Sequence, residues 1–109
     1  MIGRQWINLG VLAVLGCCAT ASHAADIVQG KALARSLCSN CHIVAPGEAP
    51  AEVTAGIPDF KAIADKDGQT ADKILAAILS PHPPMPQVQL STFERGNLAA
   101  YILSLKGTN

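Results

Sequence analysis

A Cys-x-x-Cys-His motif at residues 38–42 constrains this chain more than any other feature of its sequence. Two residues separate the two thiols, and an imidazole follows the second thiol directly. On turn or helical backbone, this spacing separates the sulfur atoms by about the distance between the two vinyl groups of a porphyrin, with the histidine beneath the iron. The motif therefore predicts covalent attachment of haem c through Cys38 and Cys41, with His42 as an axial ligand of the iron.

Three other uses of closely spaced cysteines compete with haem attachment. A thioredoxin-like redox pair requires a strand before the motif, whereas the residues before Cys38 have a helical pattern. A closed zinc site needs two further Cys or His ligands, and after processing only His82 is left to offer one. A disulfide between Cys38 and Cys41 would close a tight loop with little to stabilise. Haem attachment is the interpretation that we favour.

Residues 1–24 have the organisation of a secretory signal peptide. Arg4 supplies the positive start, residues 7–16 form an almost unbroken apolar run, and small residues follow. The run is too short for a membrane-spanning helix. Small residues at the −3 and −1 positions favour cleavage after Ala24. The mature chain is then a single domain, residues 25–109.

The same segment offers a second route of processing. Residues 14–17 resemble the lipobox of bacterial lipoproteins, in which Cys17 would be acylated and become the N-terminus. Leu15 is not the small residue usual at that place, and the later cleavage site is good, so we expect the unlipidated form. Both routes export the domain, as haem attachment of this type requires, and predict a periplasmic protein. A membrane would be a partner only if Cys17 is lipidated.

Composition excludes one class of partner and favours a cofactor. Loss of Arg4 with the signal peptide leaves seven basic residues against eight acidic ones. No basic stripe is present, so nucleic acid is not an expected partner.

The mature domain keeps three aromatic residues, Phe60, Phe93 and Tyr101, which make a thin core for a chain of this length. A large, apolar porphyrin would complete that core.

Apolar periodicity and capping residues predict an all-α fold without strands. The expected helices cover residues 26–41, 59–65, 70–79 and 91–106. Their expected N-caps are Asp26, Asp59, Thr70 and Ser91, and Ser91 forms a capping box with Glu94. The fold would thus be three longer helices plus a short one around the covalently attached haem.

The loop over residues 43–58 is rich in proline and glycine and has no period. Loops of this length are usually functional or wrap a cofactor. We expect one of its proline carbonyls, that of Pro46 or Pro50, to accept a hydrogen bond from His42 Nδ1 and so orient the ring.

A second loop, Pro-His-Pro-Pro-Met-Pro at residues 81–86, is stiff and extended because four prolines exclude helix and central strand. Met85 is the only methionine left after processing. A thioether is a soft, neutral ligand that favours ferrous haem iron. We predict Met85 as the second axial ligand rather than as core filler, with His82 as the alternative ligand.

Over residues 26–106 the chain resembles the class I c-type cytochromes. The haem-attachment motif near the end of the first helix, the methionine loop and the segment Ile57-Pro58-Asp59-Phe60 are similar to those of small bacterial monohaem members. The resemblance implies the cytochrome c fold for residues 25–109.

The family also packs a glycine of the first helix against the last helix, near a leucine and an aromatic residue. Gly30, Leu98 and Tyr101 match these positions, which explains a glycine in the middle of a helix. Ala34 stands where many members have an aromatic residue. We therefore expect a looser helix crossing here.

The resemblance implies a one-electron carrier, not an enzyme, in which His42 and Met85 hold the iron in both oxidation states. Its partners would be membrane or periplasmic oxidoreductases, docked at the haem edge through apolar contact more than through a ring of lysines. Two alternatives remain. One is a haem-based ligand sensor or peroxidase-like domain with an open sixth position. The other is a dedicated cytochrome subunit of a dehydrogenase complex.

Overall fold

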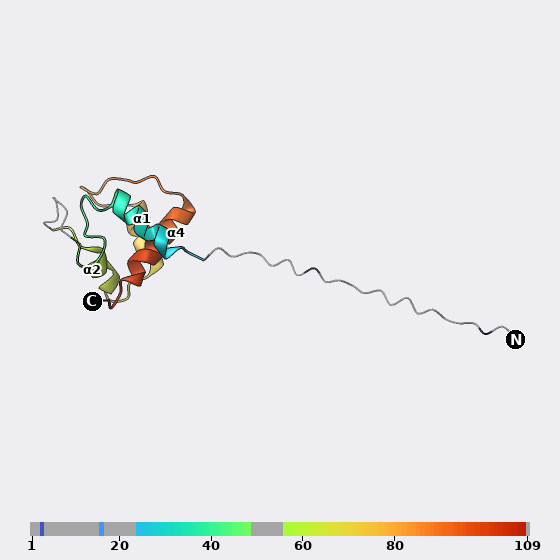
Figure 1. The fold of residues 1–109 in the computed structure, drawn as a ribbon. Helices are drawn as coiled ribbons and strands as arrows, with labels where there is room; N and C mark the ends of the chain where they lie inside the picture. Colours follow the sequence, from blue (N-terminus) through green and yellow to red (C-terminus); the bar gives the residue numbers. More distant parts are fainter. Residues whose placement is uncertain (1–2, 4–15, 17–23, 49–55, 109) are drawn as a thin grey trace.

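The computed structural model describes Gly3, Gly16, residues 24–48 and residues 56–108. In these residues the chain forms four helices and no strand: α1 (Ile27–Leu37), α2 (Phe60–Asp65), α3 (Ala71–Leu79) and α4 (Thr92–Ser104) (Figure 1). The all-α prediction is confirmed. Most of the predicted signal peptide, Cys17 included, lies outside the described residues. No helix in the described ranges has the length and apolar character that spanning a membrane requires.

Each helix begins where a polar side chain accepts a hydrogen bond from a backbone N–H of the first turn. The four N-caps are the predicted ones: Asp26, Asp59, Thr70 and Ser91. At α4 the bonding is reciprocal, because Ser91 N donates to Glu94 Oε2 at 2.7 Å and Glu94 N donates to Ser91 Oγ at 3.2 Å. These local bonds satisfy N–H groups that the helix cannot pair internally.

Two helix ends differ from the prediction. The first helix ends at Leu37 rather than near Cys41, and Cys38 is its C-cap. The last helix ends at Ser104, and a turn continues to Gly107, where φ is 67°. A glycine is suited to this left-handed backbone at a helix end.

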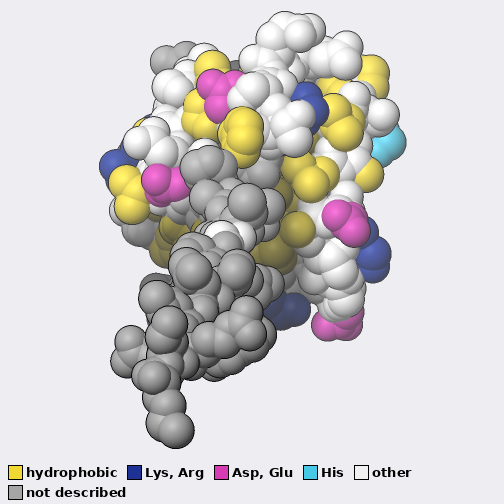
Figure 2. Space-filling model, turned by 90° about the vertical axis from the view of Figure 1, so that its right-hand side faces the viewer, with side chains coloured by type: hydrophobic (Ala, Val, Ile, Leu, Met, Phe, Trp, Pro, Cys, Tyr) yellow, Lys and Arg dark blue, Asp and Glu magenta, His cyan; other side chains and the backbone are white. Residues whose placement is uncertain are grey.

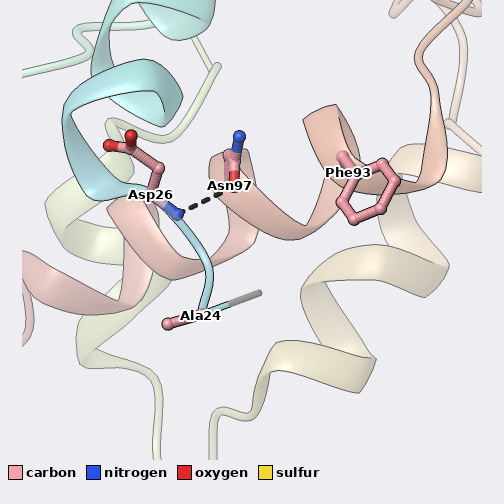
Figure 3. A pocket seen from close by; sticks show the side chains of 4 residues that line it. All are labelled: Ala24, Asp26, Phe93 and Asn97. Carbon is pink, nitrogen blue, oxygen red and sulfur yellow. Dashed lines mark hydrogen bonds between the residues drawn. The ribbon is translucent and has the colours of Figure 1, made fainter. Parts of the chain in front are cut away.

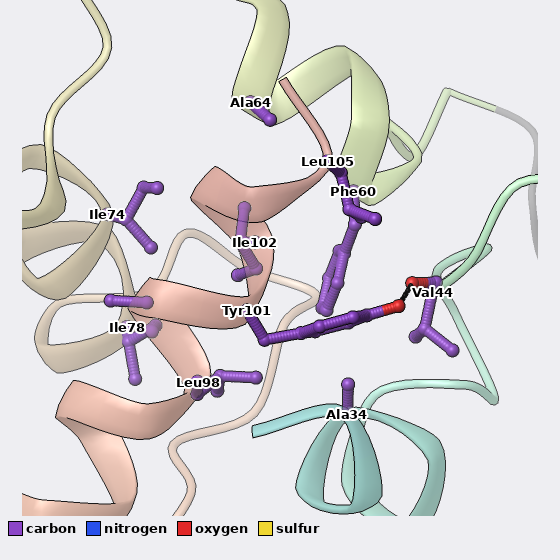
Figure 4. Close-up of a cluster of buried hydrophobic side chains, with 11 residues drawn as sticks. Ala34, Val44, Phe60, Ala64, Ile74, Ile78, Leu98, Tyr101, Ile102 and Leu105 are labelled. Carbon is purple, nitrogen blue, oxygen red and sulfur yellow. Dashed lines mark hydrogen bonds between the residues drawn. The ribbon is translucent and has the colours of Figure 1, made fainter. Parts of the chain in front are cut away.

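The buried core is organised around α4, which packs against each of the other three helices. Apolar side chains from all four helices and from the segment after the Cys-x-x-Cys-His motif converge there (Figure 4). The buried cluster consists of Ala34, Val44, Phe60, Ala64, Ile74, Ile78, Leu98, Ala99, Tyr101, Ile102 and Leu105.

The crossing of α1 and α4 is close. A Cβ atom built on Gly30 would lie 2.0 Å from the backbone oxygen of Asn97 and 2.8 Å from Tyr101 Cβ. Only glycine permits such an approach of two backbones. The looser crossing expected from Ala34 is not found, because Ala34 is fully buried beside the Tyr101 ring (Figure 4).

The beginning of α1 is also attached to α4. Asp26 N donates a hydrogen bond to Asn97 Oδ1 at 2.8 Å, beside a shallow hollow lined by Ala24, Asp26, Phe93 and Asn97 (Figure 3). This bond attaches the start of α1 to the middle of α4. The hollow contains none of the predicted cofactor residues.

Candidate cofactor site

The Cys-x-x-Cys-His motif lies in a turn directly after α1. Cys41 N and His42 N both donate to the carbonyl oxygen of Cys38, at 3.2 Å and 2.9 Å. This turn follows the helix because Cys38 N still bonds back to Ala34 O at 2.9 Å. The structure thus brings both cysteines and the histidine together at the end of α1.

The two cysteines are half-buried and are not joined to each other. Burial, together with the neighbouring Cys41, raises the pKa of the Cys38 thiol to about 11. The Cys38 thiol is therefore protonated at neutral pH. Among the described residues, moreover, no three His, Cys, Asp or Glu side chains gather in an arrangement that could hold a metal ion.

The imidazole of His42 is held by a backbone carbonyl. Its Nδ1 lies 2.7 Å from Pro58 O, and a proton on Nδ1 makes this a hydrogen bond. The prediction of Pro46 or Pro50 as the partner is wrong: the acceptor is the proline that ends the same loop. Pro50 itself lies outside the described residues. With Nδ1 occupied, Nε2 remains as the ring atom that can bind iron.

A second bond fixes the base of this loop. Phe60 N donates to Ile43 O at 3.0 Å, so the residues that follow His42 are paired with those that precede α2. The Phe60 ring also contacts the His42 ring, with 5.2 Å between centroids and a tilt of 48°. The imidazole is therefore oriented by one hydrogen bond and one aromatic contact.

The sequence did not predict the contacts that α4 makes with this loop. The hydroxyl of Tyr101, itself buried, donates to Val44 O at 2.5 Å (Figure 4). Burial, reinforced by the nearby Glu48 carboxylate, raises the pKa of Tyr101, which keeps the hydroxyl protonated and able to donate at neutral pH. The only sequence signal was a lone tyrosine at helical spacing from Leu98.

The loop is also connected to α1 by an ion pair. Arg35 Nη2 and Nε both donate to Glu48 Oε1, at 2.6 Å and 3.1 Å. Because Arg35 is more than half exposed, we expect the pair to contribute at most about 1 kcal/mol.

Met85 and His82 share one turn between α3 and α4. Met85 N donates to His82 O at 2.8 Å. The methionine is half-buried, whereas the histidine is exposed. Among the residues that the structure describes, no hydrogen bond or ring contact joins this turn to His42, so ligation by Met85 stays a prediction.

Two large apolar side chains near these segments are exposed. Leu37, next to Cys38, is 45% exposed, and Leu79, at the end of α3, is 50% exposed. A bound porphyrin needs apolar side chains of this kind to cover its faces. The imidazole nitrogen Nε2, the two neighbouring unjoined thiols and these apolar side chains all fit a covalently bound haem.

A helical domain with a Cys-x-x-Cys-His turn and a carbonyl-oriented histidine has the features of a c-type haem protein. Residues 27–106 match the family model for cytochrome c. Cytochrome c-552 of Bradyrhizobium diazoefficiens is 39% identical over 99 residues, which cover 89% of this chain and 93% of that relative. A comparison with solved structures found no significant match.

This chain therefore belongs to the cytochrome c family, as a class I c-type cytochrome. Its cofactor is covalently bound haem c, and its cysteines 38 and 41 fit the attachment motif. It is an electron carrier that works with redox partners.

Proposed function

We propose that this cytochrome is a periplasmic, monohaem one-electron carrier without enzymatic activity, in which His42 and Met85 are the two axial ligands. The observation that carries the proposal is the bond between His42 Nδ1 and Pro58 O. It leaves Nε2 available and holds the ring in one orientation. The bound haem supplies an iron centre that accepts and releases one electron.

The chain's own residues reduce the structural change that accompanies electron transfer. Pro58 and Phe60 hold the imidazole from two sides, and the proline-rich loop restricts the backbone that carries Met85. Ligands that stay in place in both oxidation states require little reorganisation. Met85 as a neutral thioether ligand would raise the potential relative to a second histidine.

The partners that we propose are redox proteins that dock through apolar contact. No Lys, Arg, Asp or Glu occurs between Lys73 and Glu94, a stretch that includes the methionine loop. On the face drawn in Figure 2, the Lys and Arg side chains lie apart from one another rather than in a cluster. Association should therefore depend weakly on ionic strength. Co-purification of a dehydrogenase in fixed proportion would instead identify a dedicated subunit.

The ligand assignment is tested with Met85→Ala in the exported, haem-loaded protein. We expect the weak long-wavelength iron–thioether band of the ferric spectrum to disappear and the reduction potential to fall, because a neutral, soft ligand has been lost. His82→Ala, in the same turn, is the matched control and should keep both properties. An unchanged band in Met85→Ala, or its loss in His82→Ala, would reassign the sixth ligand.

Carbon monoxide distinguishes the carrier from a haem sensor or peroxidase-like domain. An iron with two protein ligands has no open position, so the reduced wild-type protein should bind the gas slowly or not at all at neutral pH. Rapid, stoichiometric binding would support the sensor instead.

A further inference from the structure

The hydroxyl of Tyr101 connects the last helix to the cofactor segment across a long sequence separation. It bonds to Val44 O at 2.5 Å, and the two residues are 57 positions apart. Val44 is almost completely buried, with 1% of its surface exposed. A buried carbonyl that loses its donor must find another partner or remain unpaired, so this bond constrains where the backbone at Val44 can lie.

Three consecutive residues of this segment are each fixed by a different contact. His42 bonds to Pro58 O, Ile43 O accepts from Phe60 N, and Val44 O accepts from Tyr101. The first two contacts join the segment to the start of α2, and only the third joins it to α4. A shift at Val44 would therefore move the backbone that carries the His42 ring.

The small side chain at Ala34 makes this bond possible. In Figure 4 the Tyr101 ring extends past Ala34 towards Val44, with Phe60 on its other side. Ala34 is 0% exposed, and its methyl group leaves room for the ring where a larger side chain would displace it. The pairing of an alanine on α1 with a tyrosine on α4 thus gives the hydroxyl access to the loop.

We propose that Tyr101 is a positioning residue for the axial histidine: its hydroxyl holds the Val44 carbonyl and thereby fixes the backbone from which the His42 ring projects. The inference rests on the proposed ligation by His42. Tyr101 does not touch the reacting iron in this scheme and acts through the loop.

Tyr101→Phe in the exported, haem-loaded protein tests the role, because it removes one oxygen atom and keeps the ring. Two readouts are measured: the shifted haem-methyl proton resonances of the ferric protein, which respond to the orientation of the axial ligands, and hydrogen exchange at Phe60 N. We expect an altered haem-methyl pattern and exchange about tenfold faster, as the loss of one hydrogen bond predicts.

Ser104→Ala is the matched control. It also removes one hydroxyl from the same helix, and that hydroxyl donates to Tyr101 O at 2.5 Å rather than to the loop. We expect the control to leave both readouts at their wild-type values. If Tyr101→Phe behaves like Ser104→Ala, the positioning role is wrong although His42 still ligates the iron. If the wild-type spectrum itself lacks the signals of an axial histidine, the proposed function fails instead.

A second experiment applies if Tyr101→Phe does not accumulate as a haem protein. Tyr101 is the only tyrosine of the chain, so growth with 3-fluorotyrosine modifies this site alone. The fluorine makes the hydroxyl more acidic and a stronger donor. With the hydroxyl protonated at mildly acidic pH, we expect the haem-methyl resonances to shift and exchange at Phe60 N to slow. Unchanged resonances and exchange would overturn the inference.

Discussion

At Gly30 the absence of a side chain determines how closely two helices approach. The backbone of Asn97 occupies the space that a Cβ on Gly30 would need, and Tyr101 Cβ, also on α4, borders the same space. Backbone atoms cannot move aside as a flexible side chain can. A methyl group at this position would therefore push α4 away and weaken the packing on both sides of the crossing.

Gly30→Ala should accordingly lower the free energy of unfolding by about 1–3 kcal/mol, even though alanine is the better helix former. Denaturant unfolding of the haem-loaded protein measures this. Gly96→Ala is the control, because a Cβ at Gly96 in α4 meets no atom within 4 Å. That variant should be neutral or more stable by up to about 1 kcal/mol. Equal effects at the two glycines would contradict the close crossing.

The residues of the site differ in how well the sequence predicts them. Cys38, Cys41 and His42 form a local motif whose spacing carries its own chemical meaning. The hydrogen-bond partner of the imidazole was assigned to the wrong proline, because no local sequence pattern indicates which carbonyl of a long loop lies next to the ring. The bond from Tyr101 to Val44 was missed for the same reason: it joins distant parts of the chain.

At the scale of elements, local chemistry again predicts best. The four N-caps follow from side chains within three residues of the N–H groups they accept from, and all four are confirmed. Contacts between elements are harder to predict. Asp65, the last residue of α2, accepts a hydrogen bond from Lys61 and one from Gly107 N at 2.8 Å, 42 residues later. It joins the end of α2 to the turn after α4.

Asp65 should make stability depend on pH in the acid range. The hydrogen bonds from Lys61 and Gly107 hold the pKa of Asp65 below its ordinary value. The folded state then binds the proton more weakly than the unfolded state. The contribution of Asp65 to the free energy of unfolding is therefore complete above the ordinary Asp pKa. It is lost as the pH falls through the lower pKa of the folded state.

Asp65→Asn is expected to lower the melting temperature at pH 7 and to reduce the further loss on acidification. Thermal unfolding at several pH values measures both effects. Asp67→Asn, which removes an exposed carboxylate from the next turn, should change neither. A parallel pH profile for Asp65→Asn and the wild type would exclude this role.

At the scale of the whole molecule, α4 is the element on which the other three helices pack, and the family match covers nearly all of the described domain. Fold class and family could be predicted from the sequence because helix periodicity, caps and the haem motif agree with one another. The packing of Gly30 against α4 was predicted and is confirmed. The tight packing at Ala34 was not predicted, since it depends on where the Tyr101 ring lies in three dimensions.

The proposed export of the protein leads to a prediction about the whole chain. Cleavage after Ala24 would start the mature protein at Ala25, one residue before the N-cap of α1. Intact mass spectrometry of the exported protein should therefore give the mass of residues 25–109 with one haem. A mass that corresponds to acylated Cys17 at the N-terminus would establish the lipoprotein form instead.

Two hydrogen bonds close the base of the loop that follows the Cys-x-x-Cys-His motif, and they have a consequence for engineering. Because His42 is hydrogen-bonded to Pro58 and Ile43 to Phe60, the two ends of the loop are held together. Residues added between Gly47 and Gly56 would lengthen the loop at a small entropic cost, because that cost grows only with the logarithm of loop length. A foreign recognition peptide could be grafted there to redirect the cytochrome to a new partner while its imidazole keeps its orientation.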